Sequence, residues 1–453
     1  MIIVQRLVRI PSHLRLSAIT LALTTPLLNS PSFALDYSID LLLGSEVTDN
    51  VDRLGDNQKR EGIESYIGSD IGLTHNSEAL NFAANYHLIY RDFKNGTLET
   101  NEEINGNSEL LWEIIDSRLS WHINHDISEV LSNDLVADTV DNRETRQILS
   151  TGPTYTARMS AVDNIILSLD YTQLTQDNAF NEGPADRSDI DSERAQADII
   201  WSHSLSSTST LEVGYSHAET EFDNNSPDFN YQQLFAGYHT ELASGNYGIR
   251  LGANRVERDL IDADQTGVFT AINYNRNFSS NIFSVDIVRQ LADSSLGLES
   301  DIDSLNTNSF DEIAVVERTR LDVSYEFQNL CRGCIAQLTY TYDNSDFEND
   351  ELVLSTDSTQ DNKDNRISAN LTYNINSRLS TRLLTSYLQT DFSAFDRKDR
   401  ITEVESQTDW QLSAKLALNF SLAYINRDTK NSPLGDIDYN ASTIGISATY
   451  TIK

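Results

Sequence analysis

Side chains along most of this 453-residue chain alternate between apolar and polar in runs of about ten residues. Successive side chains of a β-strand point to opposite faces, so this alternation predicts strands with one apolar and one polar face. In residues 80–91, for example, Leu80, Phe82 and Leu88 share one face, whereas Asn81 and Asn85 lie on the other. The fold must therefore place one face of every strand in an apolar environment and the other face in a polar one.

Short polar turns separate the runs in pairs. They are predicted near residues 75–79, 116–117, 159–163, 206–209, 242–245, 278–280, 329–333, 376–377 and 413–415. One unpaired run precedes them and one follows, at residues 36–45 and 442–452. The pattern predicts twenty antiparallel strands, with eighteen as the alternative, and an even number places both termini at the short-turn end.

Strand length distinguishes the two architectures that could use this alternation. Strands of soluble β-sandwiches average about five or six residues, whereas those of outer-membrane barrels run about 9 to 11. Such barrels also combine short turns at one end with long loops at the other. The connections between hairpins are long and acidic here: residues 293–312 contain six acids and no base. We expect an all-β, transmembrane, antiparallel up-and-down barrel.

The first 34 residues have the layout of a secretory signal peptide. Arg6, Arg9 and Arg15 accompany an apolar stretch, residues 16–28, and a small-x-small cleavage sequence ends at Ala34. The stretch is shorter than the roughly 20 apolar residues of a membrane-spanning helix. We therefore predict a signal peptide over residues 1–34 and a single barrel over residues 35–453, in the outer membrane of a Gram-negative cell with both termini periplasmic.

The chain is strongly acidic, with 69 Asp and Glu against 33 Lys and Arg and a formal charge of −36. Nucleic acid is excluded as a natural partner because phosphate recognition needs a basic surface. The expected partners are outer-membrane lipid and lipopolysaccharide, together with an exopolysaccharide and periplasmic export components.

The polar strand face carries ionisable side chains of both signs, which is expected only if water is present or if the charges pair across strands. The predicted lumen-lining acids are Asp40, Asp70, Glu113, Asp170, Asp198, Glu212, Asp286, Asp322, Glu326 and Asp409. The predicted lumen-lining bases are Arg91, Arg250, Arg320 and Arg382. Cross-strand ion pairs that hold the wall are one interpretation, and a hydrated, cation-preferring channel is the other.

All four tryptophans, Trp112, Trp121, Trp201 and Trp410, fall three to five residues from a predicted short turn on the apolar face. Outer-membrane barrels place aromatic rings at both membrane interfaces. The tryptophans are therefore predicted to form an aromatic girdle at one depth.

Specific chemistry is sparse in the sequence. Cys331 and Cys334 flank a turn and are predicted to form a structural disulfide in an oxidising compartment. His122 and His125 are three residues apart, which places them on opposite strand faces and prevents a shared metal. No Gly-x-Ser-x-Gly sequence is present. We expect neither catalysis nor a cofactor or metal.

The order of segments resembles a known family. The sequence Thr48-Asp49-Asn50-Val51 after the first run, and residues 107–128, are similar to outer-membrane barrels associated with exopolysaccharide loci and the PEP-CTERM sorting system. The sequence differs from the family at Val47, where an aromatic residue is usual. The resemblance implies a role at the outer membrane in an exopolysaccharide system, as an export pore, and it implies no catalytic residues.

Two functions remain open from the sequence. The leading hypothesis is a porin-like barrel with a hydrated, acid-lined pore for exopolysaccharide export or passage of a hydrophilic solute. The alternative is a plugged structural or surface-display barrel whose acidic loops bind cations, lipopolysaccharide or partner proteins. A barrel enzyme acting on lipid would need a nucleophile–base pair that the sequence does not present.

Overall fold

The computed structural model describes residues 35–95, 98, 100–131, 137–177, 191–222, 228–258, 263–293, 315–347, 361–393, 396–432 and 437–452. The predicted signal peptide, and most of the acidic stretch of residues 293–312, lie outside the described residues. No helix in the described part of the chain is both long and apolar enough to cross a membrane.

Twenty strands lie within the described residues. The first ten are β1 (Asp36–Thr48), β2 (Gly62–Asn76), β3 (Leu80–Lys94), β4 (Asn101–Ile115), β5 (Leu119–Leu131), β6 (Arg143–Arg158), β7 (Asp163–Asp177), β8 (Ser192–Ser204), β9 (Ser209–Phe222) and β10 (Phe229–Leu242). The others are β11 (Gly245–Arg258), β12 (Ala263–Phe278), β13 (Asn281–Asp293), β14 (Val315–Phe327), β15 (Cys334–Phe347), β16 (Asn362–Asn376), β17 (Leu379–Phe392), β18 (Arg397–Gln411), β19 (Leu416–Lys430) and β20 (Tyr439–Thr451). A short 3-10 helix, η1 (Val140–Asn142), precedes β6.

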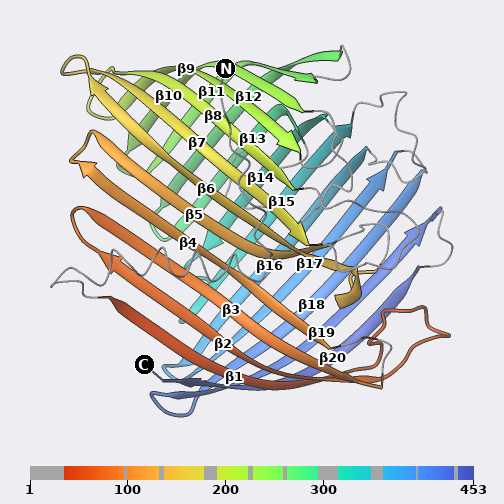
Figure 1. Ribbon diagram of the computed structural model, residues 1–453. Coiled ribbons are helices and arrows are strands. Elements are labelled where there is room, and N and C mark those ends of the chain that lie inside the picture. The colour runs from red at the N-terminus through yellow and green to blue at the C-terminus, as the bar shows by residue number, and fades with distance from the viewer. Residues whose placement is uncertain are drawn as a thin grey trace, which may run out of the picture.

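The strands form one closed antiparallel barrel (Figure 1). Each strand pairs with the next along the chain, and the ring closes where Asp40–Thr48 of β1 pairs with Thr443–Thr451 of β20. Closure removes the free sheet edges and satisfies backbone hydrogen bonds between neighbours, as a barrel in lipid requires. The predicted twenty-stranded up-and-down barrel is confirmed.

The two ends of the barrel differ. Nine short turns join the strands in pairs at one end, where the chain also enters β1 and leaves β20. These turns lie at the predicted positions. The strands run for 13 to 16 residues, longer than the expected ten. Beyond the apolar zone their outward faces carry ion pairs, such as Arg289 with Glu317, and Lys398 with Asp391 at 2.8 Å.

The outward faces carry the apolar side chains that the alternation predicts. Leu43 is 63% exposed and Leu169 is 58% exposed, and both lie in a band of outward Leu, Ile, Val and Tyr residues. In an aqueous protein such a surface would be unfavourable, whereas a barrel wall presents it to lipid.

Aromatic rings cover glycines on neighbouring strands. A side-chain carbon added at Gly44 would collide with the Tyr66 ring, and one added at Gly214 would collide with the Phe235 ring. Glycine lets the ring lie flat against the wall, a packing that supports strongly curved sheets.

Candidate functional site

The inner face of the barrel is the candidate functional site. Residues paired in register on neighbouring strands share a face, so the registers assign each side chain to the lumen or to the outside. They place every predicted lumen residue on the inner face: Asp40, Asp70, Glu113, Asp170, Asp198, Glu212, Asp286, Asp322, Glu326, Asp409, Arg91, Arg250, Arg320 and Arg382.

Most of these acids lie toward the short turns, in a region that we call the short-turn half of the lumen. There, several carboxylates contact amide or histidine side chains. Asp409 Oδ1 accepts a hydrogen bond from Asn419 Nδ2 at 2.7 Å. The His122 ring nitrogen Nε2 lies 2.6 Å from Asp170 Oδ2.

The two predicted bases of the short-turn half have polar contacts of their own. Arg250 Nε lies 3.3 Å from Glu212 Oε2 and its guanidinium stacks over Phe235. Arg382 donates a hydrogen bond to the side-chain oxygen of Gln407 at 2.7 Å. Arg250 thus neutralises Glu212, and Arg320, farther from the short turns, neutralises Asp322. The inward acids of the short-turn half outnumber these bases, so this half keeps an excess of negative charge.

Carboxylates also face one another directly across strands. Asp40 is in register with Asp70, and Asp286 is in register with Asp322. Like charges directly opposite are destabilising in a dry environment. One carboxylate of each pair has another contact, because Arg320 contacts Asp322 and the His87 ring contacts Asp70. Water or mobile cations are the remaining source of compensation for the facing carboxylates.

Arginines line the other half of the lumen, which we call the long-loop half. Those outside the predicted set are Arg146, Arg194, Arg258, Arg318, Arg366, Arg397 and Arg427. The sequence reasoning missed them because they lie near strand ends, where the outward face is also charged and the apolar alternation fades.

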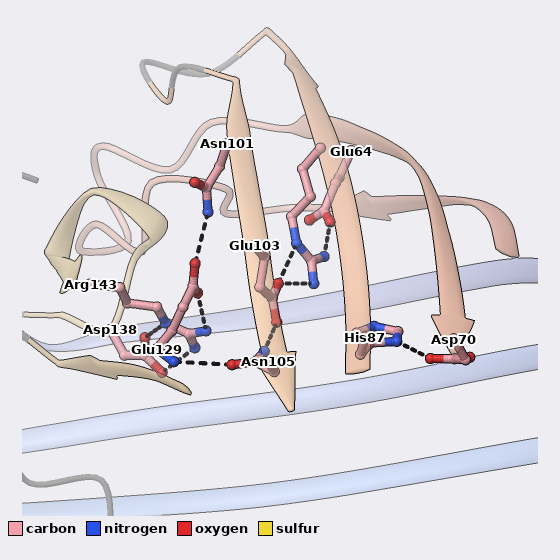
Figure 2. Close-up of polar contacts among 10 residues, drawn as sticks. Glu64, Asp70, His87, Asn101, Glu103, Asn105, Glu129, Asp138 and Arg143 are labelled. Atoms are coloured by element: carbon pink, nitrogen blue, oxygen red, sulfur yellow. Dashed lines mark hydrogen bonds and ion pairs between the residues drawn. The ribbon is translucent and has the colours of Figure 1, made fainter. Parts of the chain in front are cut away.

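Arg91 organises one charge network of the long-loop half. Its Nε donates to Glu103 Oε2 at 2.9 Å, and its NH1 contacts Glu64 on the other side. Figure 2 shows Glu64 and Glu103 approaching this guanidinium from neighbouring strands. Asn105 donates to the second oxygen of Glu103 and so extends the network toward β5.

The network continues into the β5–β6 connection. Arg143 Nε donates to Asp138 Oδ1 at 2.8 Å, and Arg143 NH1 lies 3.5 Å from Glu129. Burial would raise the pKa of the Asp138 carboxyl, but hydrogen bonds and positive charge from Arg143 and Arg53 outweigh it. The pKa of Asp138 is therefore lowered from its ordinary value.

A second network lies on β17 to β19 and is fully buried. Arg397 and Arg427 both contact Asp399 Oδ2 at 2.7 Å. The Arg397 side chain is 0% exposed and that of Asp399 is 4% exposed. The Arg397 guanidinium also stacks 4.9 Å above the Phe392 ring. One carboxylate thus bridges two buried guanidinium groups on the lumen wall.

Apolar side chains fill part of the long-loop half. Ala218, Phe222, Phe229, Tyr231, Val256, Leu291 and Val315 form one buried cluster. The cluster brings β9 to β11 together with the ends of β13 and β14 (Figure 1). The inner wall is therefore more covered here than near the short turns.

The four predicted girdle tryptophans all lie on the outer face near the short turns, and all are exposed. Trp112 and Trp121 are in register on β4 and β5, whereas Trp201 and Trp410 lie on distant strands β8 and β18. Trp121 Nε1 donates to Thr151 at 2.8 Å.

The other predicted groups have structural contacts. Cys331 and Cys334 are joined by a disulfide in the turn before β15. His125 faces outward, where its Nδ1 lies 2.8 Å from the Tyr86 hydroxyl, whereas His122 faces the lumen. Across the described residues, no three metal-binding side chains gather closely enough to hold an ion.

No protein-family model and no curated protein matches the sequence. Among solved structures, the chain is similar to the FrpB iron transporter from Neisseria meningitidis. For its F5-1 variant the TM-score is 0.52 at 8% identity, over 92% of this chain and 82% of that chain. For its F3-3 variant the TM-score is 0.51 at 9% identity, over 92% and 81%.

The siderophore receptor PirA from Pseudomonas aeruginosa matches over 94% of this chain and 81% of its own, with 12% identity and a TM-score of 0.47. At these identities the likeness concerns the fold alone. The chain shares the β-barrel fold of the FrpB iron transporter.

Proposed function

We propose that the protein is a porin-like barrel of the outer membrane that passes a hydrophilic solute through a hydrated, acid-lined lumen. The observation that carries the proposal is the excess of acids over bases on the inner face of the short-turn half, which includes Asp40 in register with Asp70 and Asp286 in register with Asp322. Basic side chains compensate some of these carboxylates, as Arg320 does for Asp322, and water or mobile cations would compensate the rest. The exposed apolar outer face supports a membrane location.

The specific role that we propose is export of an exopolysaccharide, with periplasmic export components as partners. The sequence resemblance described above suggests this role, and the polar wall is compatible with it because hydroxyl and amide groups can hydrogen-bond to sugars. We propose passage rather than catalysis, with the short-turn end and both termini in the periplasm.

A second function is a closed barrel that displays its loops, through which it binds cations, lipopolysaccharide or partner proteins. The observation in its favour is the buried cluster in the long-loop half, which includes Phe222, Phe229 and Tyr231. A barrel of about twenty strands is wide enough for an aqueous path unless it is filled, so the degree of filling decides between the functions.

Single-channel recording of the refolded protein in a planar bilayer tests the proposal. We expect stepwise conductance with a preference for cations. Absence of conductance from protein that is folded by its heat-modifiable gel mobility would defeat the open lumen and favour the closed, loop-displaying barrel.

A further inference from the structure

The β1–β2 connection, residues 49–61, packs against β20 and extends the closure of the barrel. Asp49 N donates to Ser442 O at 3.2 Å, and Ser442 N donates to Asp49 Oδ1 at 2.7 Å. Backbone pairing between β1 and β20 ends just before these contacts. The connection therefore provides partners for backbone groups of β20 on the side where its pairing with β1 has ended.

Asn50 fixes the shape of this connection. Its side-chain amide donates to Leu54 O at 2.6 Å and to Asn440 O at 2.8 Å, and its Oδ1 accepts from Leu54 N at 3.0 Å. Asn50 is 1% exposed. A buried side chain with three hydrogen bonds holds both ends of a turn in place, so the following residues are fixed relative to β20.

Arg53 lies within this turn and joins two distant parts of the wall. Its NH1 lies 3.4 Å from Asp138 Oδ2 in the β5–β6 connection. Its guanidinium also lies 6.0 Å from the centre of the Tyr439 ring on β20. Five strands, β1 to β5, separate β20 from the β5–β6 connection around the wall.

The far end of this link is also fixed. Arg143 holds Asp138 through two hydrogen bonds, of 2.8 and 3.1 Å, and Figure 2 shows this pair beside Glu129. Nearby inward side chains, Ile89 and Val130, are buried. The link thus joins two anchored ends above a covered part of the inner wall.

We propose that Arg53 and Asp138 form a fixed chord across part of the lumen mouth, and that residues 49–61 limit the size of the solute that enters. The size limit rests on the proposed passage function, whereas the chord itself does not. The wall set by twenty strands would admit larger solutes than the mouth does. The chord therefore makes the β1–β2 connection a determinant of solute size.

Crosslinking tests the chord without any transport measurement. The variant Arg53→Cys with Asp138→Cys, in isolated outer membranes, should be joined by a short bis-maleimide, and mass spectrometry of its peptides should detect one reagent molecule bound to both new cysteines. The control pair, Arg53→Cys with Asp116→Cys in a short turn, should carry only reagent attached to one cysteine at a time. Absence of the joined peptide from the first pair, when both of its cysteines have reacted, would overturn the chord.

Passage of graded neutral polyethylene glycols tests the size limit. Arg53→Ala should increase the size of the largest polymer that enters the lumen, and entry is detected because the polymer reduces conductance. Arg118→Ala, at an exposed side chain in the short turn between β4 and β5, should leave this size unchanged. An unchanged size limit in Arg53→Ala would overturn the proposed filter. Absence of conductance from the unmodified protein and from its variants would contradict both the passage function and the size filter. The crosslinking result would then be the test of the contact between residues 53 and 138.

Discussion

In the long-loop half of the lumen, several inward arginines are buried and paired with carboxylates, whereas in the short-turn half several carboxylates contact uncharged amides. Arg397, Asp399 and Arg427 exemplify the first arrangement, and Asp409 with Asn419 the second. Buried charges must be paired to avoid a large desolvation cost, whereas hydrated charges need no partner. The difference indicates that water reaches the two halves unequally.

We expect the long-loop half and the short-turn half of the barrel to have different roles. The paired networks and the apolar cluster are expected to stabilise the long-loop half. The acids of the short-turn half are expected to set the electrostatic potential of the lumen beside them. Variants that change one region, with the other region or the opposite face as the control, test this difference.

The largest effect is expected for Asp399→Ala in the long-loop half. Removing the carboxylate leaves two buried guanidinium groups without their shared partner, which should lower the free energy of unfolding by about 3–5 kcal/mol. Asp409→Ala in the short-turn half, where the carboxylate contacts Asn419, should cost less than about 1 kcal/mol. Urea unfolding in lipid vesicles measures both.

If Asp399→Ala does not fold, a triple variant keeps the comparison testable. Arg397→Met, Asp399→Leu and Arg427→Met together remove all three charges, so the barrel should recover stability relative to Asp399→Ala. Equal costs for Asp399→Ala and Asp409→Ala would mean that the two halves are hydrated alike.

The next largest effect is expected when the outer and inner faces of β7 are compared. Leu169→Arg places a charge on the outer face, beside Leu167 and Tyr171, and should destabilise the barrel by about 2–4 kcal/mol if the site lies near the bilayer midplane. Ser168→Arg, on the inner face, should cost much less because water solvates the guanidinium there. Similar losses of folded, heat-modifiable protein for the two variants would reverse the assignment of faces.

These faces were readable from the sequence because the period of alternation is two over most of every strand. The twenty strands and the nine turn positions follow from it, as do the inward acids. The inward positions of the long-loop arginines could not be predicted from this alternation. Residues such as Arg255 and Asp264 make the outward face polar there as well. The contact of Arg53 with Asp138 depends on the closed ring, which no local pattern encodes.

A third prediction concerns the potential in the short-turn half. Replacing Asp170, Asp198 and Asp286 together with Asn should reduce cation selectivity, because exposed carboxylates are ionised at neutral pH and concentrate cations. Reversal potentials across a salt gradient measure the change. Selectivity of the unmodified protein should also weaken at high salt, where screening shortens the reach of a charge to about 3 Å at 1 M. If a glycan passes through this lumen, we expect it to be neutral or cationic, because the inward acids repel an anionic solute.

The control variant removes the same number of negative charges from positions outside the lumen. Glu193, Glu219 and Glu221 face outward at the long-loop ends of β8 and β9, so their replacement by Gln should leave selectivity nearly unchanged. Equal shifts for the two triple variants would mean that total charge, rather than the acids of the lumen, sets the preference. Anion selectivity in the unmodified protein would contradict the acid-lined pore directly.

The smallest effect concerns acid stability at the lumen mouth. Because Arg143 and Arg53 lower the pKa of Asp138 in the folded protein, its ionised form stabilises the barrel above the unfolded pKa, and this stability is lost as pH falls through the folded pKa. Asp138→Asn should therefore reduce the free energy of unfolding at pH 7 by less than about 1 kcal/mol, since the pair is partly exposed. The difference between Asp138→Asn and the unmodified protein should shrink below about pH 4. Asp116→Asn, in an exposed short turn, should show no such convergence. A difference that stays constant down to the lowest pH at which the barrel folds would mean that the carboxylate of Asp138 is not held by these arginines.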